Sequence, residues 1–401
     1  MAINHFIKDY SSSAMITGFI AVLVSYAGPF AIVFQAANTI NMPTELVTSW
    51  VWAISIGSAV TGISLSLYYK MPIITAWSTP GAALLVASLA HYRYEEVVGA
   101  FLISGMLIFI LGITGLFQKI MKQIPSTISA AMLAGILFHF GESVFKQLEV
   151  NMSFVLPLII SYLIGKRLYP RYAILSTLVI GFALVGFERG LNLEAGDFSF
   201  ATPIFTMPEF STASIIGLAI PLCIVTMTSQ NVPGLAVLNA DGYRPNANPL
   251  IYVTGLISIV LAPFGAHGIN LAAITAAICT GRESHENASK RYVSGVFCGF
   301  FYLIIGLFGA AVASVFFILP QALIATIAGL ALFSSLGNGL ALSMRNEKER
   351  EAALVTFLVT VSGFSFFGIG SAFWGLIGGM LTHVLVVYQL ILPSNSGHVT
   401  K

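Results

Sequence analysis

The chain has 401 residues, of which 57% are hydrophobic and only 8% are charged, against a charged share of about 25% in soluble domains. A soluble core of this size could not bury so much apolar surface, so the composition excludes a soluble protein and predicts a polytopic protein in the lipid bilayer. The net charge of +2 gives no sign of a nucleic-acid partner.

A membrane-spanning helix needs roughly 20 apolar residues, and on this basis the sequence predicts an all-α membrane protein with fourteen spans. Three of these spans are shorter than a full crossing. No cleavage pattern follows the first apolar run, so we expect it to be a mature span and not a signal peptide. The expected spans are 14–36, 45–67, 72–90, 95–117, 125–145, 152–165, 173–187, 212–237, 248–264, 267–280, 292–315, 319–337, 350–368 and 371–392.

The positive charges predict the orientation of these spans. With both termini in the cytoplasm, the inner loops hold fifteen of the eighteen Lys and Arg residues, and the outer loops hold only Arg93, Lys146 and Arg189. Such an excess inside is what the positive-inside rule requires. Merging or splitting one span would reverse the later loops and remove the excess.

The third span, which includes Pro72–Leu85, contains an apparent break. Ile73 to Trp77 is β-branched and aromatic, which suits a short extended segment. Ser78, Thr79 and Pro80 are residues that begin helices. The sequence therefore predicts an extended stretch followed by a half-helix whose free N–H groups face a ligand. A proline-kinked structural helix is the alternative.

The long polar stretch Glu188–Phe210 is expected to connect two halves of seven spans each. An odd number of spans gives the halves opposite orientations, as in inverted-repeat transporters. At an offset of 195 residues, Pro72–Leu85 corresponds to His267–Thr280 in span ten, which also begins flexibly and continues into small residues. Two half-helices would then place their electropositive N-termini near mid-membrane, where they could bind a small organic anion.

Polar and aromatic residues near these breaks are the candidate ligand contacts. Span eight contains five polar residues in the six positions from 226 to 231 and then a Pro-Gly break. Intramembrane polar groups of this kind face the bundle interior, either to bind a ligand or to join helices. Aromatic rings near the breaks supply flat apolar walls or simple packing. The candidates for substrate binding are Ser25, Tyr26, Trp77, Ser78, Thr79, Gln230, Asn231, Asn270 and Thr275.

Titratable groups are scarce within the spans. None of the sixteen Asp and Glu residues lies in the middle of a span, which leaves His267 as the proton-coupling candidate and His139 as a weaker one. A lone histidine also serves as a hydrogen-bonded structural residue. No catalytic or nucleotide-binding motif is present, and neither the cysteines nor any other residues have metal-ligand spacing. We therefore expect no enzyme activity, no cofactor and no metal.

With these residues, the chain resembles the benzoate/proton symporters of bacteria, within the uracil-permease-like superfamily. The resemblance covers nearly the whole chain and is most specific at 74–81, 228–234 and 239–243. It implies import of benzoate or a similar aromatic carboxylate with a proton, in the bacterial inner membrane. It also implies a core domain in 1–120 and 211–316, a gate domain in 121–190 and 317–401, a periplasmic connector in 191–210, and a homodimer.

The chain departs from the nucleobase branch of that superfamily at two positions. Gln230 and Thr275 lie at or near positions where that branch has substrate-binding glutamates. An amide or hydroxyl can donate to a carboxylate that a glutamate would repel, but the obvious proton carrier is lost. Uncoupled anion channels and transporters of another small anion or a nucleobase remain the alternatives.

Overall fold

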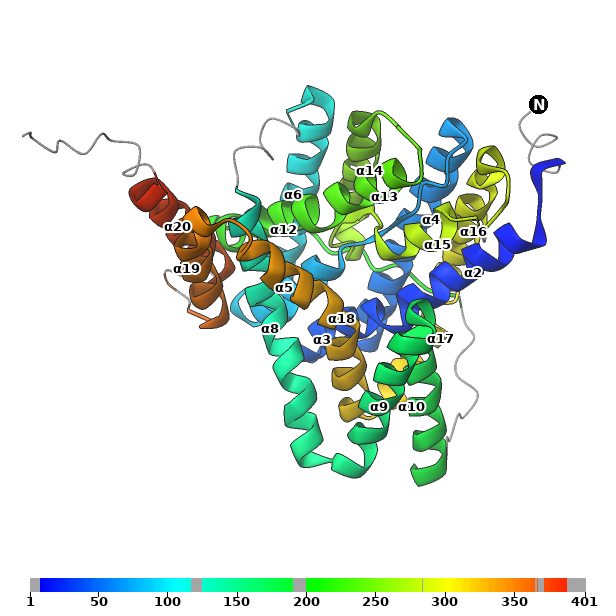
Figure 1. The fold of residues 1–401 in the computed structure, drawn as a ribbon, viewed down its shortest axis with the longest axis horizontal. Coiled ribbons are helices and arrows are strands. Elements are labelled where there is room, and N and C mark those ends of the chain that lie inside the picture. Colours follow the sequence, from blue (N-terminus) through cyan, green and yellow to red (C-terminus); the bar gives the residue numbers. More distant parts are fainter. Residues whose placement is uncertain are drawn as a thin grey trace, which may run out of the picture.

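The computed structural model describes residues 8–116, 125–189, 200–282, 284–364, 366 and 371–387, and these are mostly helical (Figure 1). Eight of the described helical runs are long and apolar enough to cross a membrane. They are Ser12–Thr39, Thr44–Tyr69, Tyr94–Thr114, Ser126–Val150, Thr212–Asn239, Ala247–Phe264, Ala288–Leu307 and Gln321–Ser343. The chain is therefore a polytopic, mainly helical membrane protein.

The first half of the chain contains eight of the described α-helices and one short strand. Its elements are α2 (Ser12–Ala27), α3 (Pro29–Thr39), α4 (Thr44–Tyr69), β1 (Thr75–Trp77), α5 (Thr79–Ser88), α6 (Tyr94–Thr114), α8 (Ser126–Val150), α9 (Met152–Leu168) and α10 (Ala173–Arg189). The expected first span is divided at Gly28, because Pro29 has no N–H to continue the hydrogen bonding of α2.

The second half contains α-helices, π-helical turns and the second strand. Its elements are α11 (Thr212–Ser214), η3 (Ile215–Ala219), α12 (Ile220–Thr226), η4 (Met227–Asn231), α13 (Val232–Ala240), α14 (Ala247–Leu261), η5 (Ala262–Phe264), β2 (Ile269–Leu271), α15 (Ile274–Thr280), α16 (Tyr292–Leu307), α17 (Gly309–Ile318), α18 (Gln321–Ser343), α19 (Arg350–Val361), α20 (Ser371–Thr382) and η8 (His383–Val387). The elements η3, η4 and η8 are π-helical, whereas η5 is a 3-10 turn.

A helix or strand begins close to the start of each of the fourteen expected spans. Several of these elements are shorter than a bilayer crossing, so the count of fourteen stays a prediction. Span thirteen is one of the short ones, because α19 ends at Val361. Part of the expected connector, residues 190–199, lies outside the described residues.

The described part of the connector is extended and lies over helix ends. Its backbone N–H groups at Ala201, Thr206 and Glu209 donate to the carbonyls of Leu307, Pro263 and Glu95, respectively. These three acceptors lie at the end of α16, in η5 after α14, and at the start of α6. All three ends fall on the outer side in the predicted topology, so one strip of backbone joins ends that are expected to share a membrane face.

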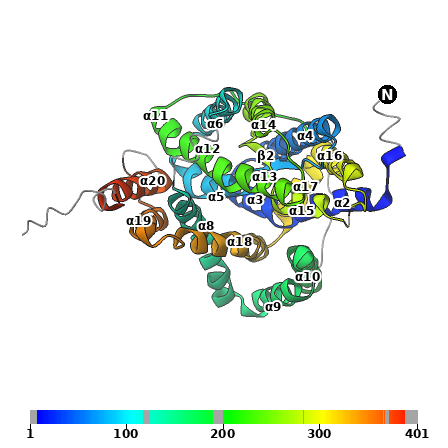
Figure 2. The same ribbon diagram turned by 45° about the horizontal axis from the view of Figure 1, so that its top comes forward.

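The helices pack in pairs, three of which combine the two halves of the chain and two of which lie within one half. α4 packs against α16, α6 against α14, and α8 against α18, while α9 packs on α10 and α19 on α20. Figure 2 shows α8, α9, α10, α18, α19 and α20 on one side of the molecule, and α4, α6, α14 and α16 on the opposite side. The two strands lie among the elements between these groups.

Candidate functional site

The two strands pair with each other in the interior. β1 and β2 are antiparallel, with Thr75 opposite Leu271, Ala76 opposite Asn270, and Trp77 opposite Ile269. Two further backbone hydrogen bonds extend the pairing, from Ser78 N–H to the Gly268 carbonyl (3.1 Å) and from Ala272 N–H to the Ile74 carbonyl (2.9 Å). The structure thus bears out the extended stretches expected in spans three and ten, and it joins them into one two-stranded ribbon.

The start of α5 is capped as its sequence predicts. The Ser78 hydroxyl accepts a hydrogen bond from the Gly81 N–H at 3.1 Å, and Pro80 occupies the first turn, where no backbone donor is needed. Gly81 permits close packing, because a Cβ there would lie 2.7 Å from a methyl carbon of Leu222. Thr79 is partly exposed in this first turn, and its hydroxyl has no hydrogen bond to any described residue.

The start of α15 differs from that of α5. Its N-cap residue is Ala273, which offers no side-chain cap, and the helix has seven residues. Because the strands are antiparallel, α5 begins beside Gly268 whereas α15 begins beyond the opposite end of the ribbon. The two helix starts are therefore separated by the length of the strands, roughly 10 Å at 3.3 Å per residue. They flank the ribbon and do not meet.

The polar run of span eight begins with Thr226 at the end of α12 and continues through the π-helical turn η4, and it contacts both strand–helix units. The Thr226 hydroxyl donates to the Ser78 hydroxyl at 2.8 Å. The Asn231 side-chain oxygen accepts from the Leu271 N–H at 2.9 Å, and its nitrogen donates to the Met227 sulfur at 3.1 Å. A π-helical turn of this kind is often found at functional sites. The polar run of span eight thus lies against both β1–α5 and β2–α15.

Serine side chains fix the outer edges of the ribbon. Ser66 of α4 donates to the Ile73 carbonyl (3.0 Å) and accepts from the Ile73 N–H (3.2 Å). Ser258 of α14 bonds Ile269 in the same way, with its donor contact at 3.5 Å and its acceptor contact at 2.8 Å. Thr75 is also held, by a 2.7 Å contact between its hydroxyl and that of Thr61. The ribbon is thus attached to one helix from each half.

Aromatic rings enclose one end of the ribbon. The Trp77 ring centroid lies 5.2 Å from that of Tyr26, 6.3 Å from that of Phe30, and 5.9 Å from that of Tyr302. The Tyr26 hydroxyl is hydrogen-bonded to Ser55. The Tyr302 hydroxyl donates to Ser25 at 2.6 Å. The predicted residues Tyr26 and Trp77 therefore share one cluster, and Ser25 reaches it through Tyr302.

Several polar groups near the ribbon have no partner. The indole nitrogen of Trp77 is buried and has no hydrogen-bond partner among the described residues. The Gln230 side chain is partly exposed, and Thr275 is buried, and neither forms a hydrogen bond within the described part of the chain. A buried donor without a partner costs about 1–3 kcal/mol. These groups are therefore available to a ligand that accepts hydrogen bonds.

Asn270 has a different environment. Its side chain is fully buried on β2, and its amide lies between the Ser78 N–H and the Leu271 carbonyl. In the orientation that satisfies both, its oxygen accepts from Ser78 at 2.9 Å and its nitrogen donates to Leu271 at 3.0 Å. Asn270 thus stabilises the ribbon from within.

His267 lies at the entry to β2. Its imidazole is buried, with ring centroids 6.2 Å from Trp50 and 6.1 Å from Phe101, and the backbone of Ser78 lies close to it. Neither ring nitrogen has a hydrogen-bond partner among the described residues. Gly265 makes this packing possible, because its φ is +101° and a Cβ there would overlap Trp50. His267 is thus adjacent to the cap of α5.

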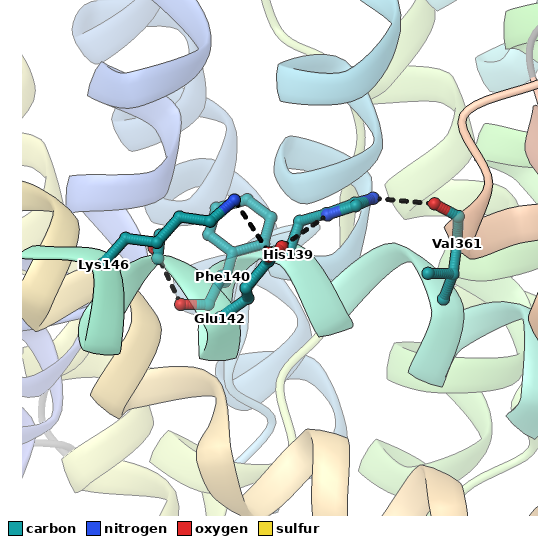
Figure 3. Close-up of polar contacts among 6 residues, drawn as sticks. His139, Phe140, Glu142, Lys146 and Val361 are labelled. Carbon is teal, nitrogen blue, oxygen red and sulfur yellow. Dashed lines mark hydrogen bonds and ion pairs between the residues drawn. The ribbon is translucent and has the colours of Figure 1, made fainter.

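His139 lies on the exposed side of α8, among Glu142, Lys146 and Val361 (Figure 3). Its Nδ1 lies 3.2 Å from a Glu142 carboxylate oxygen, and its Nε2 lies 2.9 Å from the Val361 carbonyl at the end of α19. Lys146 forms an ion pair with Glu142 at 2.8 Å. These contacts join α8 to the end of α19 through His139.

Sequence reasoning missed some members of this site. Tyr302 looks like any other aromatic residue in an apolar span, and no local signal links it to Trp77. Ser66 and Ser258 likewise resemble the other serines of long helices. Thr226 belongs to the polar run, yet its sequence gives no sign of its contact with Ser78. Only the packed structure brings these residues to the ribbon.

Comparison with known sequences identifies relatives along the whole chain. The sequence profile of a family described as "Benzoate membrane transport protein" matches residues 8–385. The chain is 43% identical over 380 residues to the "Benzoate membrane transport protein" of Acinetobacter baylyi, covering 95% of this chain and 96% of the relative. It is 42% identical over 381 residues to "Inner membrane protein YdcO" of Escherichia coli K12, covering 95% and 97%.

Solved structures share the fold at low sequence identity. SLC26A9 superposes with a TM-score of 0.62 at 15% identity, covering 96% of this chain, and this chain spans 66% of the length of that one. The transmembrane domain of the cyanobacterial bicarbonate transporter BicA gives 0.59 at 15% identity, covering 92% and 96%. At such identity the likeness shows the fold alone.

Proposed function

Because this chain belongs to the benzoate membrane transport family, we propose that it imports benzoate or a similar aromatic carboxylate together with a proton. The chain is a multi-pass inner-membrane transport protein. Its relative from Acinetobacter baylyi bears the name of a benzoate transport protein. The orientation expected from its charges, with both termini in the cytoplasm, is part of the proposal.

Two inverted repeats of seven spans form the proposed architecture. A two-fold relation that takes span n to span n+7 converts the α4–α16 contact into the α14–α6 contact, and it converts the α9–α10 pair into the α19–α20 pair. The α8–α18 contact and the β1–β2 ribbon map onto themselves. The matching bonds of Ser66 to Ile73 and of Ser258 to Ile269 also fit this relation.

The substrate carboxylate is proposed to bind beside the ribbon, with the substrate ring against Tyr26 or Trp77. The observation that carries this proposal is the Trp77 indole N–H, which is buried next to the capped start of α5 and has no partner in the part of the chain that the structure describes. Gln230, Thr79 and Thr275 supply further unpaired donors around the ribbon. An anion accepts hydrogen bonds from such groups and also benefits from the partial positive charge of the first turn of α5.

The proton has two candidate carriers in this proposal. His267 has an imidazole close to the backbone of Ser78, and neither ring nitrogen is hydrogen-bonded to a residue that the structure describes. A proton there would place a positive charge close to the proposed carboxylate site, so binding of the anion and of the proton would favour each other. The substrate's own carboxyl group is the other candidate carrier.

Movement of two parts of the molecule is the proposed transport step. The core domain would comprise residues 1–120 and 211–316, and the gate domain residues 121–190 and 317–401. Figure 2 supports this division, because α8, α9, α10, α18, α19 and α20 gather on one side. A core that moves against the gate would expose the ribbon to each side of the membrane in turn. The homodimer expected from the resemblance is also part of the proposal.

Uptake by purified protein in liposomes tests the function. When the outside is more acidic, we expect radiolabelled benzoate to accumulate faster than in protein-free liposomes, which take up only the undissociated acid through the lipid, and we expect an uncoupler to abolish this accumulation. Substituted benzoates should compete, whereas uracil and sulfate should not. Benzoate that only equilibrates across the membrane, whatever the proton gradient, would indicate an uncoupled anion channel and would refute the coupled mechanism.

The substitution Trp77→Phe tests the binding site. It removes the indole N–H and retains an aromatic ring, so the loss of one hydrogen bond to a charged group is expected to raise the Kd for benzoate by roughly tenfold or more. Equilibrium binding of labelled benzoate measures this change. Trp52→Phe is the matched control, since Trp52 packs against Phe264 away from the ribbon. Equal affinity of the Trp77→Phe variant and the natural protein would refute the proposed site.

A further inference from the structure

A cavity lies between α3 and α18, apart from the ribbon. Its volume is about 420 Å³, within the range of roughly 300–1,000 Å³ that is typical of small-molecule sites. The end of α3 and the start of α18 supply most of its lining. α3 belongs to the proposed core and α18 to the proposed gate, so the cavity is located at the boundary that transport would open. In the predicted topology this end of both helices faces the outside.

The lining of this cavity combines amides with aromatic rings. Gln35, Asn38, Asn41 and Gln321 contribute amides, and Phe34 and Phe316 contribute rings whose centroids lie 5.5 Å apart. No residue that lines the cavity in the described part of the chain carries a charge. The side-chain oxygen of Gln35 is buried and has no hydrogen-bond partner among the described residues.

This lining selects for a particular chemical class. An amide can donate to a carboxylate and can both donate to and accept from a protonated carboxyl group. The rings can pack against an apolar ring of the ligand. A doubly charged inorganic anion would lose its hydration without gaining a cationic partner, which is unfavourable. A small aromatic monocarboxylate, in either protonation state, therefore fits the cavity best.

Aromatic rings separate this cavity from the ribbon. Phe316 lines the cavity, and its ring lies 4.8 Å from the ring of Phe30 in an edge-to-face arrangement. Phe30 is fully buried and lies 6.3 Å from Trp77 by ring centroids. The path from the cavity to the proposed carboxylate site is thus closed by the Phe30–Phe316 pair, which belongs to α3 and α17.

We propose that this cavity is a second, outer binding site for the aromatic carboxylate, which is occupied before the substrate passes Phe30 and Phe316 to reach the ribbon. The identity of the ligand rests on the proposed function, and the location and lining of the site do not. The cavity then acts as an antechamber on the uptake path. It can be occupied independently of the ribbon site, because the two sites share no ligand-binding side chain.

Protection of an introduced cysteine tests the antechamber. The three natural cysteines are all buried, so the substitution Asn38→Cys supplies a thiol for a membrane-impermeant thiol reagent applied from outside to the full-length protein in liposomes. Benzoate at ten times its half-protecting concentration should slow labelling about tenfold. Gln147→Cys, at the end of α8 and outside the cavity, is the control and should label at the same rate with and without benzoate.

The decisive measurement uses a background in which the ribbon site is weakened, namely Trp77→Phe combined with Gln230→Ala. Neither of these side chains hydrogen-bonds a described residue. Benzoate should still protect Asn38→Cys in this background, with a half-protecting concentration within about twofold of that in the otherwise natural protein. Protection that disappears in this background would show that it originates from the ribbon site, and would overturn the proposal.

Other outcomes also decide between the two proposals. Benzoate uptake by the natural protein with no protection of Asn38→Cys in either background would overturn the antechamber and leave the proposed function intact. Protection without any benzoate uptake would support the antechamber and count against the transport proposal. Failure of the outside reagent to reach Asn38→Cys in the folded protein would overturn an outward-opening cavity.

Discussion

At the scale of single residues, the polar side chains around the ribbon divide into two groups. The Ser78 hydroxyl is hydrogen-bonded to Gly81 and Thr226. The Asn231 amide is hydrogen-bonded to Leu271 and Met227. A substitution that removes one of these side chains would therefore first change the position of the ribbon. Trp77 retains an unpaired donor, so a ligand can use it without breaking a bond in the protein.

Gln230 provides a prediction about charge. Gln230→Glu keeps the shape of the side chain but places a carboxylate in the turn η4, where it would repel a carboxylate substrate. At pH 7 we expect benzoate binding to fall by at least about tenfold, since like charges in a partly desolvated site are strongly unfavourable. Binding should recover as the pH falls, because protonation removes the charge.

Labelled benzoate bound to purified protein between pH 7 and pH 5 measures this effect. Gln230→Met is the control, because it removes the amide without adding a charge and should weaken binding by the same factor at each pH. If the Gln230→Glu and Gln230→Met variants showed the same pH dependence, the carboxylate would not lie near the substrate, and Gln230 would be removed from the site.

At the scale of elements, the ribbon depends on two helices that do not belong to it. A two-stranded sheet leaves the backbone groups of both outer edges unpaired, and such groups are costly in a membrane interior. Ser66 donates to the carbonyl of Ile73 and shares its N–H with the Met71 carbonyl, and Ser258 bonds both the N–H and the carbonyl of Ile269. α4 and α14 therefore set the position of β1 and β2.

Ser66→Ala and Ser258→Ala test this dependence. Ser258→Ala removes the partner of the buried Ile269 N–H. Ser66→Ala removes the hydroxyl donor to the Ile73 carbonyl, while the Ile73 N–H keeps its bond to the Met71 carbonyl at 2.8 Å. Each loss is expected to cost about 1–3 kcal/mol of stability. We expect both variants to melt at a lower temperature in detergent and to lose benzoate affinity. Ser64→Ala is the control on α4, because Ser64 is exposed and bonds only to its own helix. If Ser66→Ala or Ser258→Ala melted at the same temperature as the natural protein, the hydrogen bonds of that serine to the ribbon would not contribute to stability.

Local sequence was sufficient for the strand–helix unit at β1 and α5. The β-branched run before Ser78 and the Ser-Thr-Pro sequence are local signals, and both act within a few residues. The turn η4 could not be predicted in this way, because an extra residue per turn in a helix reflects tertiary contacts such as that of Asn231 with Leu271. Tyr302 was missed for the same reason.

The relative placement of the two helix starts also required the structure. The sequence correctly indicated two interrupted segments, but it could not give the register of β1 on β2. Antiparallel pairing puts the starts of α5 and α15 at opposite ends of the ribbon. Only the α5 start combines a side-chain cap with a helix of ten residues, so the ligand site is expected to lie nearer to Trp77 than to Thr275.

At the scale of the whole molecule, the connector groups helix ends that the predicted topology assigns to one side of the membrane. The described connector bonds to the ends of α16, η5 and α6, which the predicted topology places on the outer face. The loop between α18 and α19 contains Arg345, Lys348 and Arg350 and is predicted to lie inside. The packing of the connector thus groups these three ends together, and that they lie on the outer face stays a prediction from the charges.

Labelling from the two sides of the membrane checks this topology. Thr202 and Lys348 are both exposed in the structure. In intact cells an impermeant thiol reagent should label Thr202→Cys, and it should label Lys348→Cys only after the membrane is permeabilised. The natural protein serves as the unlabelled control, because its cysteines are buried. Labelling of Lys348→Cys in intact cells would mean that the number of spans between the two positions is wrong.

The pairing of β1 with β2 has a consequence for biosynthesis. Thr75 to Trp77 leave the ribosome long before Ile269 to Leu271, yet each strand is the other's hydrogen-bonding partner. The backbone groups of β1 therefore stay unpaired while the intervening chain is translated and inserted. Unpaired strand edges in nascent chains can pair with the wrong segment. A ribosome stalled shortly before Ile269 should therefore yield a membrane-inserted chain that degrades quickly and binds no substrate.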